Sequence, residues 1–139
     1  MTDLDKAKAY LADGRTCAVC LDDRVYESRE RGLKPLLTWL DEGVDLMGYS
    51  AADKAVGAGA AMLYCLLGVR RVHGRLMSVS AVKVLRTQGI EASWDTLTEH
   101  ILNRSKLGLC PIESALLGIE DPEEGLPILR RALSRIGTQ

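Results

Sequence analysis

A run of small, uncharged residues near the middle of the chain constrains the fold more than any other feature. No charged residue occurs between Ala55 and Leu67, and the first seven residues of this run are Ala or Gly except for Val56. Small side chains let a helix approach a sheet closely, and the absence of charge predicts burial. We therefore expect a central, buried helix over Ala52–Leu67, with Asp53 and Lys54 at its N-terminal end.

Length and composition predict one soluble globular domain over residues 1–139. The chain is 47% hydrophobic and 27% charged, as ordinary globular proteins are, and its length is sufficient for one continuous core. The net charge of −1 provides no field that would attract nucleic acid or an anionic membrane, so we expect neither as a partner. The longest uncharged run, Ala55–Val69, is too short to span a bilayer. The polar N-terminus is unlike a signal peptide, and we expect a cytoplasmic location.

Helical and strand-like segments alternate along most of the chain. The predicted helices are Leu4–Ala12, Leu33–Asp41, Ala52–Leu67, Ser78–Thr87, Leu97–Ile101, Pro111–Leu117 and Pro122–Arg135. The predicted strands are Arg15–Leu21, Val25–Ser28, Val44–Tyr49, Arg70–Leu76 and Ile90–Trp94. An opening hairpin followed by strand–helix–strand units predicts an α/β protein, a three-layer α/β/α sandwich around a mixed five-stranded sheet.

Asp53 and Lys54 are the leading candidate site residues. In open α/β sheets ligands bind at the carboxyl ends of the strands, and this rule selects residues 50–54 and 77–81. Gly57 and Gly59 lower helix stability relative to alanine, which indicates that something approaches that face closely. The alternative is that Asp53 only complements the helix dipole, that Lys54 is solvated, and that a neighbouring element is what approaches.

A second candidate region runs from Asn103 to Glu113. Pro111 and Glu113 are typical of a helix start, which places Cys110 at the N-cap, where cysteine is a poor choice. The positive end of a helix, together with Arg104, favours a thiolate there, so Cys110 is a candidate nucleophile. The alternative is a buried structural cysteine. Asn103 and Arg104 are candidate binding residues because they lie in a predicted loop.

Three weaker candidates follow from single residues. Ser78 is either an N-cap or a binding residue at the second strand end, and His73 on a strand is interpreted as structural. Cys17 and Cys20 have the spacing of a zinc ligand pair, but residues three apart on a strand face opposite sides. We therefore expect reduced, structural cysteines, and neither a metal nor another cofactor.

Several blocks of this sequence resemble a known family, in the same order along the chain. They are Gly43–Leu46, Ala52–Gly57, Asn103–Arg104, Gly108–Glu113 and Ile119–Glu124. Between about Arg15 and about Leu133 the chain is similar to domain-of-unknown-function family 1893. The resemblance implies a cytidine-deaminase-like fold without the deaminase metal site. Zinc deaminases open one helix with His-x-Glu and the next with Pro-Cys-x-x-Cys. The corresponding starts here, expected at Ala52–Lys54 and Ser78–Val82, contain no His, Cys or Glu.

Three hypotheses for function follow. The first is a metal-free deaminase-like domain that binds a nucleoside- or nucleotide-type ligand, with ADP-ribose among the candidates. Its expected ligand-binding residues are Asp53, Lys54, Ser78, Asn103, Arg104, Cys110 and Glu113. The second is a protein-interaction module or homo-oligomeric scaffold with a vestigial pocket. The third is a cysteine-dependent enzyme that uses Cys110.

Overall fold

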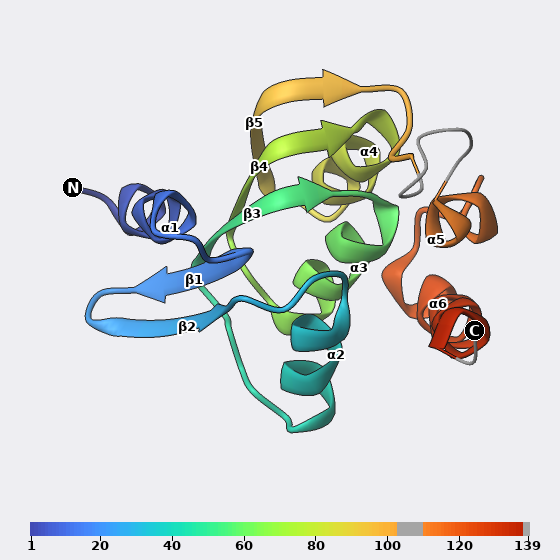
Figure 1. The fold of residues 1–139 in the computed structure, drawn as a ribbon, viewed down its shortest axis with the longest axis horizontal. Coiled ribbons are helices and arrows are strands. Elements are labelled where there is room, and N and C mark those ends of the chain that lie inside the picture. Colours follow the sequence, from blue (N-terminus) through green and yellow to red (C-terminus); the bar gives the residue numbers. More distant parts are fainter. Residues whose placement is uncertain (103–109, 138–139) are drawn as a thin grey trace.

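The centre of the structure is a mixed five-stranded sheet with strand order β2-β1-β3-β4-β5 (Figure 1). The computed structural model describes residues 1–102 and 110–137. The strands are β1 (Cys17–Leu21), β2 (Arg24–Ser28), β3 (Ser50–Val56), β4 (Arg71–Ser78) and β5 (Glu91–Thr98). Strand β1 pairs antiparallel with β2 and β3, whereas β3, β4 and β5 run parallel. The predicted α/β class and mixed five-stranded sheet are therefore confirmed.

Helices pack against both faces of this sheet. The helices are α1 (Asp3–Ala12), α2 (Lys34–Asp41), α3 (Ala58–Leu67), α4 (Val79–Thr87), α5 (Pro111–Ala115) and α6 (Pro122–Gly137). Because strand residues alternate between faces, Ala18 and Cys20 of β1 pack under α1, while Val19 belongs to the larger core on the other side. That larger core contains α3, which lies against α2, α4 and α6.

The central helix begins later than its composition indicates. Residues 52–56, predicted as its first turns, belong to β3, and residues 44–49 form no strand. Ser50–Asp53 pair with β1 on one side, and β3 pairs with β4 on the other. Two sets of inter-strand hydrogen bonds thus outweigh the local helix preference of alanine. Gly57 is the N-cap in an extended conformation, and the helix starts at Ala58.

The last strand is longer than predicted. The segment expected as a helix over residues 97–101 begins instead as β5, which continues to Thr98. Leu97 and Thr98 pair with Met77 and Ser78 of β4, and this pairing holds the segment extended. Helix α5 ends at Ala115, two residues earlier than expected, while α6 extends to Gly137. The predicted loop at 103–109 lies outside the described residues.

Glycines allow the other helices to approach α3 closely. A Cβ atom on Gly59 would lie only 2.8 Å from Ile112 Cγ2, 2.9 Å from Leu33 Cδ1 and 3.0 Å from Leu129 Cδ1. Gly125 of α6 similarly faces Met62 of α3 at very short range. The close approach expected from the glycines is therefore observed, and it is made by side chains from α5, α6 and the start of α2.

Within the described part of the chain, no helix is both long enough and apolar enough to cross a bilayer.

Candidate functional site

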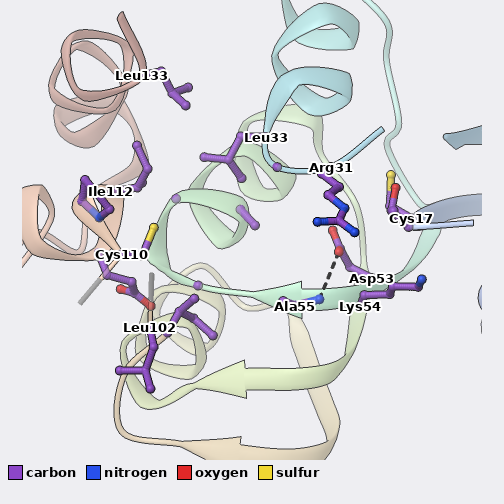
Figure 2. Close-up of a pocket in the computed structure, with 18 residues that line it drawn as sticks. Cys17, Arg31, Leu33, Asp53, Lys54, Ala55, Leu102, Cys110, Ile112 and Leu133 are labelled. Carbon is purple, nitrogen blue, oxygen red and sulfur yellow. Dashed lines mark hydrogen bonds between the residues drawn. The ribbon is translucent and has the colours of Figure 1, made fainter. Parts of the chain in front are cut away.

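A pocket of about 660 Å³ lies beside β3 and the first turns of α3. Its size falls within the range of small-molecule sites. Its apolar lining comes from Leu33, Ala55, Ala60, Ile101, Leu102, Pro111, Ile112 and Leu133. Its polar lining comes from Thr16, Cys17, Arg31, Asp53, Lys54, Cys110 and Glu113. The lining comes from β1, β3, the segment before α2, the start of α3, α5 with the residues before it, and α6, and Figure 2 shows the pocket between them.

Asp53 reaches this pocket from the middle of β3, and not from a helix N-terminus as predicted. The Tyr64 hydroxyl of α3 donates to Asp53 Oδ2 at 2.7 Å, and the Ala55 N–H donates to Oδ1 at 3.3 Å. Burial raises the pKa of Asp53 to about 7, although these hydrogen bonds oppose the shift. Near neutral pH, Asp53 can therefore either accept or donate a hydrogen bond.

Two further groups lie around Asp53. Cys17 is its cross-strand partner on β1, and Tyr64 is completely buried. Burial and the Asp53 charge together raise the pKa of Cys17 to about 12 and that of Tyr64 well above its ordinary value. Both groups are neutral at pH 7, so Asp53 is the titrating group of this cluster. Neither Tyr64 nor the position of Cys17 in the pocket was predicted from the sequence. A tyrosine within an otherwise apolar helix was the available signal for Tyr64.

Glu113 is the other acidic residue of the pocket. Its side chain is on α5 and only 3% exposed, yet Oε1 has no hydrogen-bond partner in the described structure. It faces the N-cap of α3, where a Cβ on Gly57 would lie 2.7 Å from Oε1. A larger residue at position 57 would displace this carboxyl group. A close approach was expected at Gly57 as well as at Gly59, and at Gly57 the approaching group is an acidic side chain.

Two cationic residues line the same pocket. Lys54 follows Asp53 on β3 and is exposed, and Arg31 extends into the pocket from the segment before α2 (Figure 2). Arg31 was missed by sequence analysis because nothing in its local pattern connects it to β3. Asn103 and Arg104, the binding residues predicted in the loop before α5, lie outside the described residues.

Cys110 lines the pocket as expected, whereas Ser78 and His73 have structural roles. Cys110 is half-buried at the N-cap of the five-residue α5. Ser78 is fully buried at the N-cap of α4, where its hydroxyl accepts from the Ala81 N–H at 3.1 Å, and it lies outside the pocket. His73 is hydrogen-bonded to Ser93 and Asp95, and burial lowers its pKa.

The four cysteines are expected to differ in reactivity. Burial raises the pKa of Cys17 and of Cys65 to about 12, and it also raises that of Cys20, so few thiolates form at these positions near neutral pH. Under native conditions at neutral pH, iodoacetamide should modify Cys110 at least tenfold faster than the other three, as followed by peptide mass spectrometry. Equal rates at all four positions in the folded protein would contradict this, and denatured protein serves as the control.

The described residues contain no group of three or more His, Cys, Asp or Glu side chains placed to hold a metal ion. Cys17 and Cys20 indeed face opposite sides of β1, the first toward the pocket and the second toward α1. The actual helix starts after β3 and β4, at Gly57–Gly59 and Ser78–Ser80, have neither deaminase motif.

Fold and site together define an α/β domain with a mixed sheet and a small-molecule-sized pocket beside its central strand. The chain belongs to the DUF1893 family, because residues 6–133 match the family model described as "TM1506: Domain of unknown function (DUF1893)". It is similar to the crystal structure of a DUF1893 family protein, TM1506, from Thermotoga maritima. The identity is 27% and the TM-score 0.82, over 97% of this chain and 91% of that one. Comparison with curated proteins finds no match.

Proposed function

We propose that the pocket binds a nucleoside- or nucleotide-type ligand, with ADP-ribose among the candidates. The supporting observation is that Asp53 and Glu113 line one pocket whose other walls are largely apolar. A nucleoside likewise combines apolar surface with hydrogen-bonding groups. Its flat base suits apolar walls, while its ring edges and ribose hydroxyls require hydrogen-bond partners.

In this proposal the two ends of the pocket hold different parts of the ligand. Figure 2 shows Arg31, Asp53 and Lys54 at one end, and Leu102, Ile112 and Leu133 toward the other. Asp53 would hydrogen-bond the ribose hydroxyls. Arg31 and Lys54 would contact phosphate, which guanidinium and ammonium groups bind well. The base would lie between the apolar side chains.

We also propose that the domain has the three-layer, cytidine-deaminase-like arrangement that the family resemblance implies. The support is topological, because α3 and α4 each follow one of the parallel strands β3 and β4. Those positions correspond to the two helices that carry the motifs of zinc deaminases. Since Gly57–Gly59 and Ser78–Ser80 lack the zinc ligands and the proton-transferring Glu, the proposal is binding without zinc-dependent deamination.

Calorimetric titration tests the proposal with adenosine, cytidine, AMP, ADP and ADP-ribose. We expect at least one of these to bind, and Asp53→Ala to weaken its binding at least tenfold, the effect of a lost hydrogen bond to a charged group. Asp23→Ala, in the exposed turn between β1 and β2, is the matched control and should bind like wild type. If no compound binds, or if Asp53→Ala binds as tightly as wild type, the proposal is wrong.

The third hypothesis, a cysteine-dependent enzyme, has one observation in its favour. Cys110 lines the same pocket as the two acidic residues, so a bound ligand could contact its thiol. Protection of Cys110 from iodoacetamide by a bound ligand would place that ligand at the thiol. Turnover that is lost in Cys110→Ser would be needed to support catalysis.

A further inference from the structure

Glu113 has a feature that, given the proposed function, points to a role in ligand selection. Glu113 is only 3% exposed, and its Oε1 has no hydrogen-bond partner within the described structure. Buried polar atoms are nearly always hydrogen-bonded, so an orphan acceptor in a pocket wall is uncommon. A carboxyl oxygen accepts hydrogen bonds, so the partner that Oε1 lacks is a donor.

Among the residues that the structure describes, none donates a hydrogen bond to Glu113 Oε1. A Cβ atom on Gly57, the N-cap of α3, would lie 2.7 Å from Glu113 Oε1 and 3.2 Å from Ile101 Cγ1, so both side chains face this glycine. Gly57 has no side chain that could cap the helix or contact the carboxyl group. The two cationic residues at the other end of the pocket, Arg31 and Lys54, make no hydrogen bond or ion pair with Glu113 in the described structure. A ligand is therefore the natural source of the donor.

The position of Glu113 indicates which part of a ligand would reach it. Glu113 belongs to the same short helix as Ile112, and Ile101 and Leu102 line the pocket beside it. The described lining at this end is otherwise largely apolar, which suits a flat ring better than a phosphate. The group that reaches Glu113 is accordingly a donor on the edge of a ring, and an exocyclic amino group is such a donor.

We infer that Glu113 is a specificity-determining residue that selects ligands whose ring carries an amino group over their oxo counterparts. An amino group donates to the carboxylate, whereas an oxo oxygen at the same place brings two acceptors together and leaves the carboxylate without a partner. Cytidine is thus preferred to uridine, and adenosine to inosine, in whichever of these pairs fits the pocket.

Matched amino and oxo ligands test this inference. In calorimetric titrations at constant pH, the wild type should bind the amino member of at least one pair ten or more times tighter than the oxo member, on the order of the discrimination a designed hydrogen-bond site achieves. Glu113→Gln offers both a donor and an acceptor, so it should reduce that ratio to about threefold or less. Glu124→Gln, an exposed change in α6, is the control and should keep the wild-type ratio.

The possible outcomes separate this inference from the proposed function. Ligands that bind in an Asp53-dependent manner with equal affinity for amino and oxo members overturn the role of Glu113 and leave the proposed function standing. A preference that persists in Glu113→Gln also overturns it. If no nucleoside or nucleotide binds, both are wrong. Circular dichroism establishes that Glu113→Gln is folded, and Glu113→Asp, which withdraws the carboxyl group, should weaken the same preference if the Gln variant does not fold.

Discussion

Replacing Asp53 by Asn should remove a loss of stability that the wild-type protein undergoes as the pH rises from about 4 to about 7. The pKa of Asp53 is raised by burial from 3.8 to about 7 in the folded protein. Between these values the folded state keeps a proton that the unfolded chain has lost, so the free energy of unfolding falls as the pH increases and levels off above the folded pKa. The protonated, neutral side chain is the form that the fold prefers.

The size of this pH dependence follows from the raised pKa of Asp53. The difference between a pKa of 3.8 and one of about 7 corresponds to an upper bound of about 4 kcal/mol in the free energy of unfolding. Because Asp53 keeps partial contact with solvent through the pocket, we expect about 2 kcal/mol for the wild-type protein. Urea denaturation of wild type, Asp53→Asn and the exposed control Asp23→Asn at about pH 4 and about pH 8 measures it. The difference between wild type and Asp53→Asn should change between the two pH values, and a constant difference would refute the assigned pKa.

Replacing Leu129 by Ala should lower the free energy of unfolding by about 3 kcal/mol, a large share of the stability of a typical domain. Leu129 is completely buried in α6, and its Cδ1 atom lies in the close contact with Gly59 of α3. Removing its branched end leaves a cavity there. Since Leu133, one turn later, lines the pocket, ligand affinity should decrease as well.

Chemical denaturation with a matched leucine tests this prediction. Leu117→Ala makes the same change at a side chain that is 53% exposed and should cost less than about 1 kcal/mol. Equal effects at the two positions would contradict the arrangement of α6 on α3. If Leu129→Ala is too unstable to purify, Leu129→Val leaves a smaller cavity and should have an effect of the same sign, by about 1 kcal/mol.

Four of the candidate site residues belong together in the structure. Asp53, Lys54, Cys110 and Glu113 line one pocket although they come from two segments of the chain. Asp53 and Lys54 were predicted because they were expected just after a strand, at the start of a helix. They lie in the middle of β3 instead, so they line the pocket for a different reason than the predicted one. Glu113 was found through the helix-start pattern at Pro111. Neither signal could show that Glu113 is buried without a partner, because its surroundings come from α3 and from the end of β5.

The local sequence pattern was sufficient to predict elements with strong strand or helix preferences, such as the β1–β2 hairpin and α4. It also predicted that the segment after Asp53 contains a buried helix. The tertiary structure alone decided whether residues 52–56 are strand or helix. Alanine fits either state, and hydrogen bonds to β1 and β4, which lie far away in sequence, settled the choice. The tertiary structure also brought the Tyr64 hydroxyl to Asp53, and it placed Arg31 in the pocket. Pattern in one segment carries no information about which distant side chain will fill the space beside it, since only packing of the whole chain creates that space.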